Sequence, residues 1–154
     1  MPIPHEQIDR IINEHFMFEA TDNVEGVLAS LTPDAEHEVV PSPFGAVRGR
    51  DRIRPFYEML FGDVTGEGVT PIRRLYGDDF VVDETMWHGR IEDGRVFLCE
   101  GRSGPVSFRL LHIFELQGGK ISRENVWVDL AAIQRQLGVS SAAPAGVSRV
   151  AEPG

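Results

Sequence analysis

The 154 residues, 42% of them hydrophobic, are enough for one domain with a buried core. Lysine and arginine number 15 against 24 aspartates and glutamates, giving a formal net charge of −9. This charge argues against nucleic acid or an anionic membrane surface as a partner, because both bind basic surfaces. The single cysteine, Cys99, excludes an internal disulfide and a multi-cysteine zinc site.

No apolar run approaches the roughly 18 residues of a membrane span, and the N-terminal residues lack the basic and apolar regions of a signal peptide. We therefore expect a cytoplasmic protein with no membrane partner.

Three helices are predicted in the first part of the chain, over residues 4–20, from 24 to about 31, and over 51–62. In the first, apolar residues recur at spacings of three and four and form an inward-facing stripe that includes His15 and Phe18. Thr32-Pro33-Asp34 is predicted to end the second helix, and residues 62–68 to form a polar connection.

Alternating apolar and polar residues predict strands in the remaining segments, 35–40, 69–76, 80–91, 107–116 and 121–129. Residues 96–100 fit either a short strand or an irregular loop, and 129–137 fit a final helix. Helices followed by antiparallel strands indicate an α+β fold: a curved mixed or antiparallel sheet wrapped over the N-terminal helices and enclosing an apolar pocket. We expect one domain over 1–138 and a flexible tail over 139–154.

The most informative segment is 107–116, where a histidine interrupts an otherwise apolar strand face made of Phe108, Leu110, His112, Phe114 and Leu116. Gly118-Gly119 then favours a hairpin turn. A two-residue loop places Asn125 and Trp127 beside His112, whereas a three-residue loop places Glu124, Val126 and Val128 there.

The order of elements and the segment GGKISRENVWVDLAAIQRQLG resemble the SnoaL-like polyketide cyclases, within the nuclear-transport-factor-2-like superfamily of ketosteroid isomerase, scytalone dehydratase and limonene epoxide hydrolase. The resemblance covers roughly residues 5–138. It implies a cone-shaped α+β domain, a hydrophobic small-molecule ligand and a homodimer formed through the open face of the sheet. Because this fold hosts many reactions, the resemblance alone leaves the reaction open.

Carried over by position, the resemblance places His112 at the active-site histidine of these cyclases and Val126 at their catalytic aspartate. It favours the register in which Glu124 and Val126 face inward. Asp129 matches a second aspartate of the motif, which we interpret as the N-cap of the last helix. The Arg-x-Asp pair of limonene epoxide hydrolase falls near Thr85 and Trp87, and the basic aspartate of ketosteroid isomerase near Val39, so neither site is copied here.

The candidate residues follow from strand parity and this resemblance. As catalytic residues we predict His112 for proton transfer, His37 to polarise a carbonyl or hydroxyl, and Asp83 to orient an imidazole. The predicted substrate-binding residues are His15, Phe18, Trp87, Phe114, Glu124 and Val126. A histidine on an apolar face also fits a purely structural role. No His-x-His or His-x-x-x-His pair occurs, so we predict no metal site.

These observations predict a small enzyme without a cofactor that performs general acid–base catalysis. The expected reaction is cyclisation, isomerisation or dehydration of a polyketide- or steroid-like molecule. The alternative is a non-catalytic module of the same fold that binds a small molecule or only assembles as a dimer, and the valine at position 126 supports it.

Overall fold

The computed structural model describes residues 1–139 and shows four α-helices, one 3-10 helix and six strands. Residues 140–154, most of the predicted tail, lie outside the described residues. The elements in chain order are α1 (His5–Ala20), α2 (Val24–Ser30), β1 (Leu31–Val40), β2 (Val47–Arg48), α3 (Arg50–Asp63), β3 (Val64–Tyr76), β4 (Phe80–Ile91), η1 (Arg95–Phe97), β5 (Gly104–Gln117), β6 (Lys120–Val128) and α4 (Leu130–Gln136).

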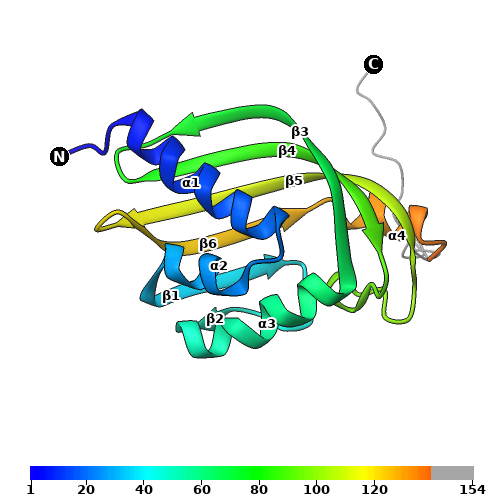
Figure 1. Ribbon diagram of the computed structural model, residues 1–154. Helices are drawn as coiled ribbons and strands as arrows, with labels where there is room; N and C mark the ends of the chain where they lie inside the picture. Colours follow the sequence, from blue (N-terminus) through cyan, green and yellow to red (C-terminus); the bar gives the residue numbers. More distant parts are fainter. Residues whose placement is uncertain (140–154) are drawn as a thin grey trace, which may run out of the picture.

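The strands form one curved sheet in the order β2-β1-β6-β5-β4-β3, with α1, α2 and α3 on one of its faces (Figure 1). All neighbouring strands are antiparallel except β1 and β6, which are parallel. This arrangement confirms the predicted α+β fold with a mixed sheet. None of the helices within residues 1–139 combines the length and apolar composition that a membrane crossing requires.

Several strands begin earlier in the chain than predicted. Thr32-Pro33-Asp34 does not form a break after α2 but lies within β1, which follows α2 directly. Residues 64–68, predicted as part of a polar connection, belong to β3. The register of β3 against β4 shifts between Gly66 and Gly68, so β3 accommodates glycines that read as a loop in the sequence. Residues 95–97 form the 3-10 helix η1, which resolves the open choice for that region in favour of an irregular connection.

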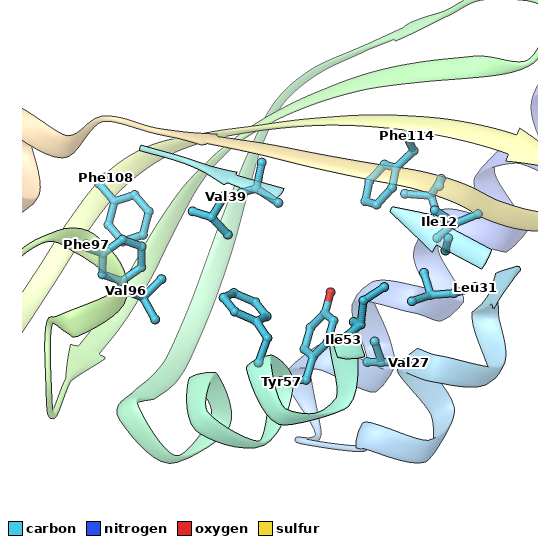
Figure 2. Packing of buried hydrophobic residues seen from close by; sticks show 14 of the residues in the cluster. Ile12, Val27, Leu31, Val39, Ile53, Tyr57, Val96, Phe97, Phe108 and Phe114 are labelled. Atoms are coloured by element: carbon cyan, nitrogen blue, oxygen red, sulfur yellow. The ribbon is translucent and has the colours of Figure 1, made fainter. Parts of the chain in front are cut away.

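The core lies between the helices and the sheet and contains the apolar stripes predicted for the helices (Figure 2). In α1 the residues that point inward are Ile8, Ile12 and His15, all completely buried. In α3 the inward stripe includes Ile53 and Tyr57, also completely buried. Two side chains with polar groups therefore enter the core from different helices.

The β5–β6 hairpin combines both registers considered for it. Its loop is the two-residue Gly118-Gly119 turn, in which both glycines have a positive φ, of 59° and 77°. A bulge at Ser122 then shifts the pairing by one residue, so that Glu124 lies opposite Phe114 and Val126 opposite His112. The bulge thus turns Glu124 toward the helices, as the family resemblance suggested.

The last helix begins where predicted. The side chain of Asp129 accepts a hydrogen bond from the backbone N–H of Ala132 at 3.1 Å, which confirms its role as the N-cap of α4.

Candidate active site

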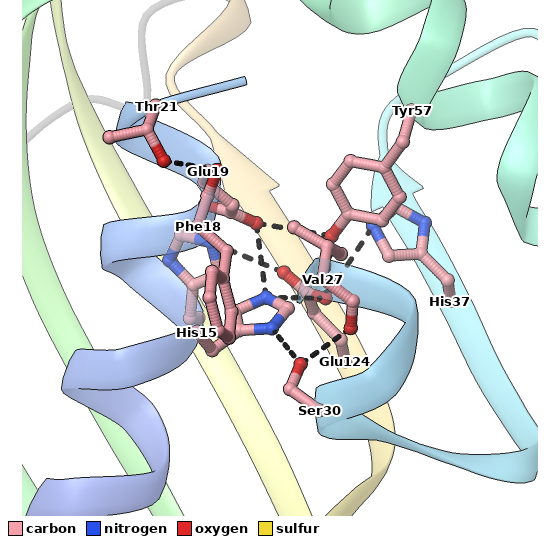
Figure 3. Close-up of polar contacts among 10 residues, drawn as sticks. His15, Phe18, Glu19, Thr21, Val27, Ser30, His37, Tyr57 and Glu124 are labelled. Carbon is pink, nitrogen blue, oxygen red and sulfur yellow. Dashed lines mark hydrogen bonds and ion pairs between the residues drawn. The ribbon is translucent and has the colours of Figure 1, made fainter. Parts of the chain in front are cut away.

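A buried carboxylate, that of Glu124 on β6, is the centre of a polar cluster beneath the helices (Figure 3). Side chains from four other elements surround it: His15 from α1, His37 from β1, Tyr57 from α3 and His112 from β5. Its Oε2 atom lies 2.8 Å from the Tyr57 hydroxyl, 3.1 Å from His15 Nε2 and 3.9 Å from His37 Nε2, and its Oε1 atom lies 3.7 Å from His112 Nε2.

His15 is held as an imidazolium. Its Nδ1 lies 2.7 Å from the Ser30 hydroxyl, which donates its only proton to the Val27 carbonyl and must therefore accept from Nδ1. Its Nε2 faces two carboxylate oxygens, those of Glu19 and Glu124, each at 3.1 Å. Burial alone would lower the pKa of His15, but the two carboxylates outweigh it and raise the pKa to about 10.

The same contacts fix the charge of the neighbouring groups. Burial would raise the pKa of Glu124, but the positive charge and hydrogen bond of His15 hold it well below its ordinary value. Burial, reinforced by the nearby carboxylates, raises the pKa of the Tyr57 hydroxyl well above its usual range. Burial lowers the pKa of His37, so this imidazole is neutral near pH 7. The cluster therefore contains a charged His15–Glu124 pair beside two neutral donors.

Glu19 connects this cluster to the surface, because its side chain is 24% exposed. The Tyr57 hydroxyl lies 3.1 Å from Glu19 as well as 2.8 Å from Glu124, so its single proton lies between two carboxylates.

One ligand atom each from His15, Glu19 and Glu124 lie within 4.8 Å of one another, a grouping that could hold a metal ion. A metal ion bound there would have to displace the proton on His15 Nε2. Metal binding and the charged His15–Glu124 ion pair therefore exclude each other.

His112 is a buried histidine with free hydrogen-bonding capacity. Its ring stacks on Phe114 with a centroid distance of 5.1 Å and meets the edge of Phe16 at 5.0 Å. Its Nδ1 atom is buried without a hydrogen-bond partner among the described residues, and so is Glu124 Oε1. Because the Nε2 side faces a carboxylate, the proton of the neutral ring is favoured on Nε2 and the lone pair on Nδ1. Nδ1 can then accept a proton from a bound molecule.

Asp83 has a different partner from the one predicted. Its Oδ2 atom accepts from the Arg74 guanidinium at 2.8 Å, and within residues 1–139 it makes no hydrogen bond or ion pair with a histidine. The carboxylates that face the imidazoles of the cluster are those of Glu19 and of Glu124, which the sequence suggested only for substrate binding. Asp83 instead lines a cavity of about 260 Å³ between α1 and β3, together with Arg74 and Asn13.

The structure thus brings together most of the predicted residues. Those that meet around the cluster are His15, His37, His112, Phe114, Glu124 and Val126. Trp87 lies instead against Phe108, with a centroid distance of 5.3 Å. Phe18 packs over Gly26 of α2.

Four residues of the site were not identified as such from the sequence: Phe16, Glu19, Ser30 and Tyr57. Tyr57 appeared only as a member of an apolar helical stripe, although a tyrosine buried in such a stripe usually finds a partner for its hydroxyl. Glu19 is four residues after His15 on the same helix, a spacing that places the two side chains together. No local pattern marked Phe16 or Ser30.

Comparison with known proteins identifies relatives of this architecture. A family model for the SnoaL-like domain matches residues 12–124. No curated protein matches the sequence at a significant level. Three solved structures illustrate the likeness, each covering more than four-fifths of both chains.

A protein of Shewanella putrefaciens CN-32 assigned to the SnoaL-like polyketide cyclases is 14% identical, with a TM-score of 0.71 over 88% of this chain and 98% of its own. An LEH-like epoxide hydrolase of M. tuberculosis is 21% identical, with a TM-score of 0.67 over 87% of this chain and 92% of its own. A protein of Catenulispora acidiphila with a ketosteroid isomerase-like fold, in complex with trimethylamine, is 16% identical. Its TM-score is 0.68 over 84% of this chain and 93% of its own. At these identities the likeness shows a common fold.

Proposed function

The chain belongs to the SnoaL-like domain family, and from this premise we propose that it is a small acid–base enzyme acting on a hydrophobic, oxygenated small molecule. The reaction class is cyclisation, isomerisation or dehydration of a polyketide- or steroid-like compound, performed by the protein's own side chains without a cofactor. The observation that carries the proposal is the buried His112–Glu124 pair, in which the Nδ1 atom of the histidine has no hydrogen-bond partner among the described residues.

In the proposed mechanism His112 Nδ1 removes a proton from a carbon next to a carbonyl group. The electron pair of that C–H bond forms a C=C bond, and the π electron pair of the carbonyl group moves onto its oxygen to give an enolate. The Glu124 carboxylate stabilises the imidazolium that forms, since its Oε1 atom lies 3.7 Å from Nε2 and needs only a small movement to accept a hydrogen bond. His112 then returns the proton to another position of the substrate. Phe16, Phe114 and Val126 exclude water from the transfer.

The remaining polar residues have supporting roles in this proposal. Neutral His37 polarises a carbonyl or hydroxyl oxygen of the substrate as a hydrogen-bond donor. His15 and Tyr57 fix the Glu124 carboxylate in its charged form, so that it orients His112 without taking up the proton itself.

The test is turnover of a panel of polyketide-like and steroid-like ketones by the wild type and by His112→Ala. We expect kcat to fall by about 100-fold or more, the usual contribution of a general base. The matched control is His88→Ala, because His88 lies on β4 bonded to Thr70 and Ser107, away from the cluster. Equal rates for folded His112→Ala and wild type would remove His112 from the mechanism.

The second candidate is a binding or assembly module with no chemistry. It is favoured by Val126, a residue without a titratable group that lies directly opposite His112, where the cyclases have their aspartate. Thermal-shift screening with hydrophobic ligands beside the turnover assay distinguishes the two. Stabilisation by a ligand that is recovered unchanged supports the module.

We further propose that the protein is cytoplasmic and forms a homodimer through the sheet face opposite the helices. Trp127 of β6 is 46% exposed on this face and is paired with Leu111 of β5. An exposed tryptophan beside a second apolar side chain suits a protein interface.

A further inference from the structure

Two buried acceptor atoms on neighbouring strands lack a partner. Asp83 on β4 and His112 on β5 lie directly opposite each other in the sheet, and both are at most 5% exposed. Directly paired residues of antiparallel strands point to the same face, with their Cβ atoms about 5 Å apart. Yet Asp83 Oδ1 and His112 Nδ1 make no hydrogen bond with each other or with any other described residue. Buried polar atoms are rarely left in this state.

The position of the Asp83 carboxylate is fixed by its other oxygen. Asp83 Oδ2 accepts from Arg74 Nε at 2.8 Å. The same guanidinium donates to Asp9 at 2.7 Å and to Asn13 at 3.1 Å, both on α1. Arg74 therefore joins α1, β3 and β4, and it holds Asp83 at the edge of the 260 Å³ cavity between these elements. With Oδ2 occupied, Oδ1 is the buried oxygen of Asp83 that has no donor among the described residues.

We propose that Asp83 Oδ1 is the binding site for a hydroxyl group of the substrate, which reaches it from this cavity and binds on the face of the sheet that carries His112. A carboxylate oxygen accepts hydrogen bonds and donates none, so it binds an alcohol or phenol and rejects a ketone or ether oxygen at the same position. The Arg74 charge balances that of Asp83, which favours a neutral hydroxyl over an ammonium group. The description of the guest as a substrate rests on the proposed function. The binding site itself rests on the two unpartnered atoms and the cavity.

The test compares β-naphthol with its methyl ether, two probes of similar size that differ in one O–H donor, by isothermal titration calorimetry. For the wild type we expect β-naphthol to bind at least about tenfold more tightly than the ether, as a hydrogen bond to a charged acceptor implies. Asp83→Asn keeps an oxygen for Arg74 but turns an amide N–H₂ toward the guest, so we expect it to abolish this preference.

Asp9→Asn is the matched control, because it alters the other carboxylate on Arg74 and leaves Asp83 intact. It should keep the preference for the hydroxyl. Circular dichroism and thermal unfolding establish whether both variants are folded. If Asp83→Asn does not fold, the comparison of the two probes on the wild type still tests the proposal.

Equal binding of the two probes by the wild type, no binding of β-naphthol up to its solubility limit, or an unchanged preference in folded Asp83→Asn would each overturn the inference. These outcomes are independent of the proposed function, which stands or fails with the effect of His112→Ala on turnover.

Discussion

His15 links the charge of the buried cluster to the stability of the fold. The folded-state pKa is about 10, against an ordinary value of 6.5, so between these values the folded protein holds a proton that the unfolded chain has released. The stabilisation of the folded state by the charged His15–Glu124 pair is therefore complete below about pH 6.5 and is lost as the pH rises toward 10. Glu124 acts in the opposite direction, because its lowered pKa makes its contribution disappear in acid.

We predict that the free energy of unfolding of the wild type falls between about pH 6.5 and about pH 9.5, by on the order of 1 kcal/mol per pH unit. His15→Gln removes the proton-binding group and should flatten this part of the profile. Urea unfolding at several pH values measures the free energy of unfolding of the wild type and of His15→Gln. The slope should persist in His88→Ala, and a slope of the same size in folded His15→Gln would contradict the assignment of the charge to His15.

A second prediction concerns the buried hydroxyl of Tyr57, which donates to Glu124 at 2.8 Å. Tyr57→Phe leaves that buried carboxylate with one donor fewer, so we expect a loss of about 1–3 kcal/mol in the free energy of unfolding. Tyr76→Phe is a suitable control, since its hydroxyl donates to Asp9 at 2.7 Å but that carboxylate is 38% exposed. Its cost should stay below about 1 kcal/mol. Equal costs in denaturant unfolding would show that burial does not strengthen the Tyr57 contact.

For single residues, the sequence identified the histidines of the cluster more readily than the side chains that contact them. His15, His37 and His112 were identified because each interrupts an apolar periodicity that can be read along the chain. Their common partner Glu124 depended on a bulge two residues earlier, and Tyr57 on the packing of a different helix. Asp83 was predicted to face inward, which it does, but Arg74 lies nine residues earlier on another strand and no local pattern joins the two.

At the scale of secondary structure elements, α1 and α2 are in contact through a glycine. A Cβ atom built on Gly26 of α2 would lie 2.3 Å from the ring of Phe18 in α1, which is well inside the distance of a normal contact. Gly26→Ala must therefore separate the helices or displace the ring. We expect a net loss of about 1 kcal/mol or more, because overpacking outweighs the helix propensity gained with alanine.

Gly62 in α3 offers the matched comparison, since an added Cβ there meets no atom within 4 Å. Gly62→Ala should raise the free energy of unfolding by about 0.5–1 kcal/mol through helix propensity alone. Opposite signs for the two substitutions in urea unfolding are the expected result. A stabilising Gly26→Ala would contradict the tight contact between the helices.

Element types were well predicted, and element ends were not. The long strands and all four α-helices were identified within a few residues. The start of β3 was missed because its glycine-rich sequence resembles a loop, and only pairing with β4 makes it a strand. The two-residue strand β2 carries too little pattern to be recognised. The hairpin register required the family resemblance, because turn chemistry alone left two registers open.

For the whole molecule, the exposed apolar surface opposite the helices leads to a prediction about assembly. We expect sedimentation equilibrium to give the mass of two chains, and Trp127→Glu to shift the equilibrium toward the monomer by placing a charge in the interface. Met17→Glu is the control, because Met17 is 55% exposed on α1, which lies across the other face of the sheet. A monomeric wild type, or no shift in folded Trp127→Glu, would exclude this interface.

The parallel pairing of β1 with β6 has a consequence for biosynthesis. β1 leaves the ribosome early, but one of its two neighbours is β6, the last strand within residues 1–139. One of the two acids that face His15 arrives with that strand. Until then the nascent chain exposes the apolar stripes of three helices, and no stable half-domain can form from them. Translation that stalls before Lys120 therefore releases a fragment prone to aggregation, which makes completion of the final hairpin the committing event of folding.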